Sequence, residues 1–132
     1  MSEPADAGFT ATHEWVQMDG DEATIGVSDY VQHKLSDIIH VELPEPDDHH
    51  YEAGEDFIVL ESLRTAMDFH VPLCGIVVAV NDQLHGKPEL INEDPYGAGW
   101  IVRMKVDNPD EFEHLLDYHE YDAGLPDDDE ED

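Results

Sequence analysis

Short apolar runs, several of them alternating with polar residues, follow one another along most of the chain. This pattern is typical of β-strands that bury one or both faces. It predicts strands at residues 14–18, 23–27, 38–43, 57–60, 69–71, 75–80 and 100–106. The runs are rich in Val, Ile and Phe, which favour strands. The chain is therefore predicted to be mainly β, a sandwich or flattened barrel with helical additions.

The segment from Phe57 to Val80 is the centre of this pattern. A polar break, Glu61–Asp68, separates two of its apolar runs and predicts a β-hairpin with Arg64 at or near the exposed tip. A residue in that place is held by two strands and is accessible to a partner. The predicted surface of the tip consists of Glu61, Ser62, Leu63, Thr65, Ala66 and Asp68.

Helix signals occur at two places. Ser28 is a good N-cap and Asp29 suits the positive end of a helix, so a short internal helix is predicted to run to about Ser36. Asn108 is the predicted cap of a second, C-terminal helix that has Pro109 at its first position and continues to residue 123. Four residues at helical spacing share one face of this helix: Phe112, Leu115, Leu116 and His119.

Residues 47–54 are predicted to form a polar loop, and residues 84–92 an irregular or short helical stretch interrupted by Pro88. The expected organisation is a disordered segment at 1–11, one domain at 12–123 and an acidic disordered tail at 124–132. Eleven apolar side chains are expected to be mostly buried: Val31, Leu35, Ile39, Val41, Ile58, Leu60, Val78, Val80, Trp100, Val102 and Leu116.

The chain has 34 acidic residues against five basic ones, and its formal net charge is −29. Residues 127–132 are all acidic, yet taking their six charges from −29 still leaves −23, so the acidity belongs to the domain. Such a surface repels nucleic acid and anionic membranes, which excludes both as partners. It suits concentrated salt, where self-repulsion is screened. A halophilic source and an acidic mesophile both fit the charge. A total of only three lysines is, however, unusual for an ordinary acidic protein.

The single cysteine, Cys74, excludes an internal disulfide, and no apolar run is long enough to span a membrane. The first ten residues have neither a basic region nor an apolar core, so no targeting signal is predicted. We therefore expect a soluble, cytoplasmic monomer.

The strongest candidate for a metal site is the loop containing Asp47, Asp48, His49 and His50, with Glu52 close by. Adjacent residues seldom converge on one ion, so a solvated acidic loop is the better interpretation and no metal site is predicted. The sequence has no Ser-His-Asp arrangement, glycine-rich phosphate loop or pair of cysteines that would indicate catalysis. A carrier or binding protein is therefore expected, and no catalytic residue is predicted.

Six motifs occur in order along the chain: Thr12–Val16, Ile25–Asp29, Val41–Pro44, Leu60–Ser62, Val80–Asn81 and Pro88–Trp100. Together they resemble the glycine cleavage system H protein family over about residues 12–121. The last motif is the most specific because of its length. The resemblance implies a lipoyl-domain-like β-sandwich, or barrel-sandwich hybrid, with a short internal helix and a C-terminal helix.

In that family a lysine at the hairpin tip carries a lipoyl group, which transports an aminomethyl group during glycine decarboxylation. The resemblance therefore implies lipoate as the family's cofactor and enzymes of glycine cleavage or lipoate handling as partners. It also implies that His13 and Glu14 line a cleft for the arm, although packing of Trp15 beneath His13 is an equal interpretation. The family pattern E-S-V-K-A-A-S-D places Arg64 at the lysine.

Arginine at this position changes the chemistry of the tip. Its guanidinium group stays protonated and is not an acyl acceptor for ligases that modify lysine. The chain has no lysine between Lys34 and Lys87, so no cofactor is predicted for it as written. Either a paralogue has lost the carrier function, or lysine was deliberately replaced to block lipoylation; the changed neighbours Thr65 and Met67 favour the paralogue.

Three hypotheses about function follow from the sequence. The chemistry of Arg64 favours a non-lipoylated interaction or regulatory module. The fold-wide resemblance favours a lipoyl-dependent aminomethyl carrier, with Arg64 a blocked or engineered attachment site. The third hypothesis, an enzyme or a metal site in its own right, rests only on the loop containing Asp47, Asp48, His49 and His50, with Glu52 close by, which we call the histidine loop.

Overall fold

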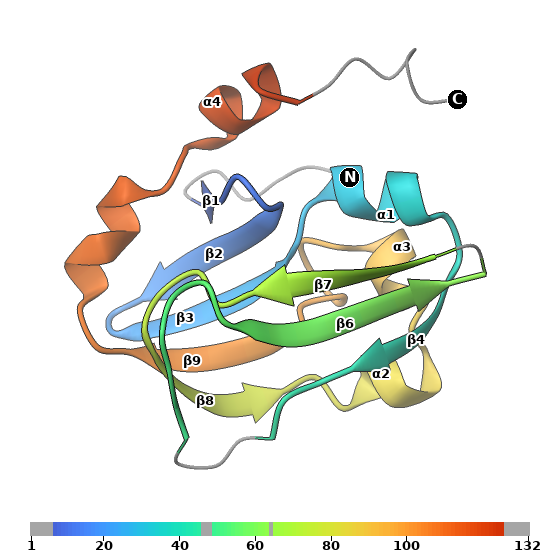
Figure 1. Ribbon diagram of the computed structural model, residues 1–132, viewed down its shortest axis with the longest axis horizontal. Coiled ribbons are helices and arrows are strands. Elements are labelled where there is room, and N and C mark those ends of the chain that lie inside the picture. Colours follow the sequence, from blue (N-terminus) through green and yellow to red (C-terminus); the bar gives the residue numbers. More distant parts are fainter. Residues whose placement is uncertain (1–6, 46–48, 64, 126–132) are drawn as a thin grey trace.

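The computed structural model describes residues 7–45, 49–63 and 65–125, which form two antiparallel sheets packed face to face (Figure 1). The larger sheet has the strand order β1 (Gly8–Phe9), β2 (Glu14–Asp19), β3 (Glu22–Val27), β9 (Val102–Val106), β8 (Gly75–Val80) and β5 (His50–Tyr51). The smaller sheet consists of β4 (Ile38–Glu42), β6 (Asp56–Ser62) and β7 (Ala66–His70). The predicted mainly β sandwich with short helices is confirmed.

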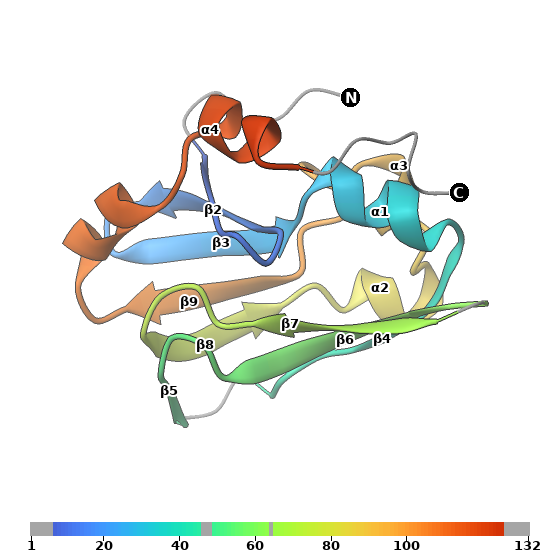
Figure 2. The same ribbon diagram turned by 45° about the horizontal axis from the view of Figure 1, so that its top comes forward.

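The main hydrophobic core lies between the two sheets, which Figure 2 shows nearly edge-on. Val16 and Ile25 enter it from the larger sheet, and Leu60 and Phe69 from the smaller one; all four are fully buried. Alternate residues of these strands face outward, as the pleat of a sheet requires. Burial of each such side chain contributes about 1.5–3 kcal/mol to folding, so the sandwich holds the β6–β7 hairpin on a rigid base.

Three short helices lie at one end of the sandwich (Figure 1): α1 (Asp29–Leu35), α2 (Gln83–Gly86) and α3 (Leu90–Glu93). α1 begins after Ser28 as predicted and buries Val31 and Leu35. The Ser28 hydroxyl makes no cap bond, because it lies 2.6 Å from the phenol oxygen of Tyr121 instead. None of the helices in the described part of the chain has the length and apolar character needed to cross a membrane.

The prediction of one continuous C-terminal helix is wrong. A 3₁₀ helix, η1 (Pro109–His114), is followed by an extended break and then by α4 (Tyr118–Ala123). The helix is broken because the backbone of Leu116 pairs with Phe9, through bonds of 2.7 and 2.9 Å that a helix would have to make internally. Asn108 caps η1 as predicted, whereas Asp117 and Glu120 form a capping box that starts α4.

The expectation of a disordered segment through residue 11 is wrong for its last part. Gly8 and Phe9 form β1 beside β2, and Phe9 is fully buried with its ring stacked on Tyr121 at a centroid distance of 4.8 Å. Ordered structure therefore includes residues 7–11. Residues 1–6 and 126–132, which were also expected to be disordered, lie outside the described residues.

Two of the eleven expected core residues, Ile39 and Val78, are 51% and 40% exposed. Each lies at a register shift, between Ile38 and His40 in one strand and between Val77 and Ala79 in the other. A β-bulge inserts one unpaired residue and turns its side chain away from the regular alternation. Six of the eleven are buried: Val31, Leu35, Val41, Ile58, Leu60 and Val102. The remaining three, Val80, Trp100 and Leu116, are half-buried.

Candidate functional site

The β6–β7 hairpin has a loop of only two residues. Glu61 pairs with Ala66, and the backbone N–H of Ser62 donates to the carbonyl of Thr65 at 2.8 Å. Only two residues of the sequence, 63 and 64, separate Ser62 from Thr65. Arg64, which was predicted to lie at or near the tip, is outside the described residues. The predicted β-hairpin is thus present, and the position of Arg64 at its tip stays a prediction.

Most of the predicted tip surface faces solvent. Leu63 is 77% exposed, which is unusual for a large apolar side chain, and Thr65, Ala66 and Asp68 are also exposed. Glu61 is half-buried. Ser62 is buried, contrary to the prediction, because its hydroxyl lies 3.3 Å from both the backbone nitrogen and the carbonyl oxygen of Thr65. The serine braces the turn and is not part of its surface.

A buried carboxylate lies where β7 ends, at the opposite end of the strand from the tip. Glu14 at the start of β2 is 1% exposed. One of its oxygens accepts hydrogen bonds from the hydroxyls of Thr10 and Thr12, and the other accepts the backbone N–H of His70 at 2.8 Å. The three donors satisfy the buried group, which would otherwise cost several kcal/mol.

The side chain of His70 reaches two carboxylates. Its Nε2 lies 3.1 Å from Oδ1 of Asp56, and its Nδ1 lies 3.7 Å from Oε2 of Glu14. This Nδ1 is buried and has no hydrogen-bond partner among the described residues. His70 is not among the site residues predicted from the sequence, because 56 residues separate it from Glu14 and only the packing of the two sheets brings them together. The one available signal is that residue 70 shares a face of β7 with Asp68.

His13 lies in a different environment from Glu14, although the two are adjacent in sequence. Its Nδ1 is 2.7 Å from the phenol oxygen of Tyr121, and its ring lies 4.8 Å from that of Tyr30. Burial lowers the pKa of His13 below its ordinary value of 6.5, against the opposing effect of the Glu14 charge. Burial also raises the pKa of the Tyr121 phenol, so this phenol remains protonated. The geometry therefore presents His13 as a neutral hydrogen-bonding group.

Trp15 is the second residue of β2. It is buried in a second cluster with Phe9 and Tyr121, and its indole N–H donates to the carbonyl of Pro95 at 3.0 Å. The absence of a side chain at Gly26 makes room for the indole, because a Cβ there would lie 2.7 Å from its Nε1 atom. The ordered loop at residues 94–100 is thereby fixed to β2.

Of the candidate ligands in the histidine loop, the structure describes His49, His50 and Glu52, and Nδ1 of His50 lies 3.4 Å from Oε2 of Glu52. His50 turns toward Asp107, which accepts a hydrogen bond from its ring, whereas His49 packs edge-on against Tyr51. Asp47 and Asp48 lie outside the described residues. Within the described ranges, no three His, Cys, Asp or Glu side chains are grouped as metal ligands. The prediction that this loop binds no metal tightly stays a prediction.

Comparisons with known proteins agree with this architecture. The family model described as glycine cleavage H-protein matches residues 7–128. The glycine cleavage system H protein of Vibrio cholerae is 46% identical over 121 residues, which cover 91% of this chain and 95% of the relative. That of Syntrophomonas wolfei is 49% identical over 116 residues, covering 88% of each.

A solved structure also matches. The crystal structure of a glycine cleavage system H protein from Mycobacterium marinum superposes with a TM-score of 0.79 at 33% identity. The match covers 92% of this chain and 99% of the other. The chain therefore belongs to the glycine cleavage H protein family, whose members are carrier proteins and not catalysts.

Proposed function

We propose that this chain is a family member without a lipoyl group on its hairpin, which acts as an interaction or regulatory module for enzymes of glycine cleavage or lipoate handling. The observation that carries the proposal is the identity of residue 64, an arginine that follows Leu63 in the sequence at the position where the family has its modified lysine. A guanidinium group is neither deprotonated nor acylated under conditions that modify an amine. The lysines of the chain, Lys34, Lys87 and Lys105, are in or beside α1, α2 and β9, and none belongs to the β6–β7 hairpin.

The environment of Glu14 supports the same proposal. The resemblance assigns this residue and His13 to a cleft for the loaded arm. In this chain, the Glu14 oxygens already accept three hydrogen bonds from Thr10, Thr12 and His70. His13 is likewise engaged by Tyr121. Because these side chains are already hydrogen-bonded within the chain, they do not require a positively charged group on a loaded arm as a partner. This fits a protein that carries no such arm.

The lipoyl-dependent carrier remains the second candidate, because the family match extends over nearly the whole chain and the hairpin is intact. In that case, Arg64 is a blocked or engineered attachment site. The two candidates differ in one property, the ability of residue 64 to form an amide with lipoate.

Mass spectrometry separates the two candidates. After incubation with lipoate ligase, lipoate and ATP, we expect the intact mass of the chain to be unchanged. An Arg64→Lys variant should gain one lipoyl group if the recognition surface is retained. Thr65→Lys is the matched control, since it adds the same amine one position away. A lipoyl group on Lys34, Lys87 or Lys105 of the parent chain would overturn the proposal.

Docking is tested separately. The unmodified chain is added in excess to a lipoylation reaction on the Vibrio cholerae relative. We expect slower modification of the relative, because this chain occupies the same enzyme surface without being consumed. An unchanged rate at every concentration would refute the ligase as its partner.

A further inference from the structure

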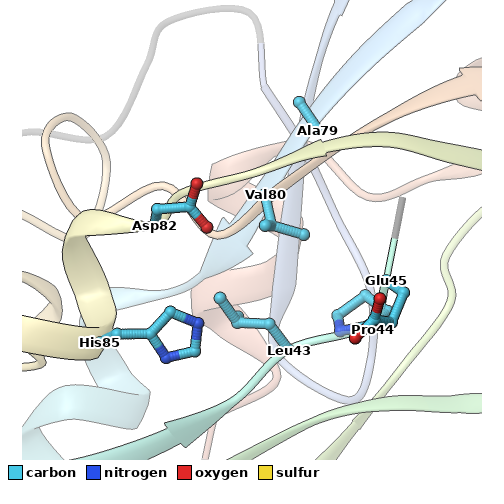
Figure 3. Close-up of a pocket in the computed structure, with 7 residues that line it drawn as sticks. All are labelled: Leu43, Pro44, Glu45, Ala79, Val80, Asp82 and His85. Atoms are coloured by element: carbon cyan, nitrogen blue, oxygen red, sulfur yellow. The ribbon is translucent and has the colours of Figure 1, made fainter. Parts of the chain in front are cut away.

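A recess lies at one end of the sandwich, and none of its lining residues belongs to the β6–β7 hairpin. It has a volume of about 440 Å³ and is lined by residues from three parts of the chain: Leu43, Pro44, Glu45, Ala79, Val80, Asp82 and His85. Figure 3 shows Asp82 and His85 projecting from the α2 side toward Val80 and Leu43, with Pro44 and Glu45 on the facing wall. Its volume lies in the range of small-ligand pockets, about 300–1,000 Å³.

The lining of the recess has an apolar part and a polar, acidic part. Leu43, Pro44, Ala79 and Val80 provide an apolar floor, and all four are half-buried. Glu45 and Asp82 provide two carboxylates at the rim, and His85 provides an imidazole. None of the described residues that line the recess is a lysine or an arginine. The complementary ligand therefore has an aliphatic stem and a positively charged end.

The polar groups are not used by the fold. Asp82 occupies the N-cap position of α2 but makes no capping bond. Among the described residues, the side chains of Glu45, Asp82 and His85 form no hydrogen bond or ion pair with one another or with a further residue. Because an exposed carboxylate that braces no local structure is available to a ligand, these groups differ from Glu14 and from His50, which are both engaged within the chain.

We propose that this recess binds a lysine or arginine side chain presented by a partner protein. The stem would lie on Leu43 and Val80, and the cationic end would meet Asp82 and Glu45, which form charge-assisted hydrogen bonds with such donors. The net charge of −29 attracts a basic partner surface, and exposed Val78, next to Ala79 in β8, offers apolar contact beside the recess. This inference is independent of whether residue 64 carries a lipoyl group.

The test uses three blocked amino acids as probes: N-acetyl-lysine-N-methylamide, its arginine counterpart and the neutral norleucine counterpart. Each is titrated into the ¹⁵N-labelled full chain at fixed ionic strength. We expect lysine and arginine probes to shift the amide signals of Ala79, Val80, Asp82 and His85, and the neutral probe to bind at least about threefold more weakly. Binding of the neutral probe with equal affinity would overturn the role of the carboxylates.

Variants locate the site. Asp82→Asn combined with Glu45→Gln should weaken binding of the lysine probe by about tenfold or more. Glu113→Gln, which removes one exposed charge from η1, is the matched control and should leave binding unchanged. Because the changed residues are exposed and unbonded, the spectrum should show an intact fold. Equal weakening by the control would mean diffuse attraction to an acidic surface, and the proposal would fail.

A fourth probe separates a partner's side chain from a free metabolite. Butylammonium has the same stem and charge but no peptide groups. The lysine probe should bind at least as tightly, since its backbone remains outside the open recess. If butylammonium bound and the lysine probe did not, the recess would be a site for a free amine, and the partner proposal would be wrong.

Discussion

The Nδ1 atom of His13 lies 2.7 Å from the phenol oxygen of Tyr121, although 108 residues separate the two in sequence. The same phenol lies 2.6 Å from Oγ of Ser28. One hydroxyl thus joins the start of β2, the residue before α1 and the C-terminal helix α4. This contact fixes α4 to the sandwich.

Replacement of Tyr121 by Phe should destabilise the protein by about 1–3 kcal/mol, because it leaves half-buried His13 and buried Ser28 without their shared hydrogen-bond partner. Urea unfolding at constant high salt measures the change. His119→Asn, on an exposed position of the same helix, should stay within about 0.5 kcal/mol of the parent. Equal stability of Tyr121→Phe and the parent would show that the contact does not stabilise α4.

His13 should make stability depend on pH. Its folded-state pKa is lowered, so the unfolded chain takes up the proton first as the pH falls. The free energy of unfolding should therefore decrease as the pH falls below the ordinary value of 6.5. His13→Asn removes the imidazole that takes up this proton, and asparagine tolerates the positive φ of 82° at this position. The stability advantage of the parent over this variant should shrink between about pH 7.5 and 5; parallel curves would contradict the assignment.

His50 should behave in the opposite way. Its hydrogen bond to Asp107 raises its pKa, and the charges of Asp107 and Glu52 add to the effect. Stability gained from its protonated form is therefore present below 6.5 and lost as the pH rises through the raised pKa. NMR titration of the ring protons should show Asp107→Asn lowering this pKa more than Glu52→Gln does. The reverse order would reject the contact with Asp107.

The melting temperature should increase with KCl. The self-repulsion of a chain with a net charge of −29 is long-ranged in dilute salt. Between about 0.1 and 1 M, the screening length falls from about 10 to about 3 Å. Calorimetry across this range should show a steady increase, and a melting temperature that does not change would remove the halophilic interpretation of the charge.

Alternating patterns predicted the strands that build the sandwich, because a strand with one buried face alternates apolar and polar residues along the sequence. The β6–β7 hairpin followed from the polar break at Arg64. Cap residues marked helix starts correctly at Ser28 and Asn108. These features are local, so a single sequence contains them.

The errors have a common origin in contacts between distant segments. The bulges that expose Ile39 and Val78 depend on pairing with neighbouring strands. The break at Leu116 arises because Phe9 competes for its backbone groups. Likewise, His70 approaches Glu14 only after the two sheets pack. The spacing of apolar residues within one strand or helix carries no information about such contacts.

The two-residue loop of the β6–β7 hairpin also has an evolutionary consequence. Inserting or deleting one residue there would shift the register of β7, turning Phe69 out of the core and Asp68 into it. Point substitution at the tip leaves that register untouched. A lineage can therefore exchange the chemistry at position 64 in a single step while the fold is preserved, so loss or regain of a carrier role need not pass through an unstable ancestor.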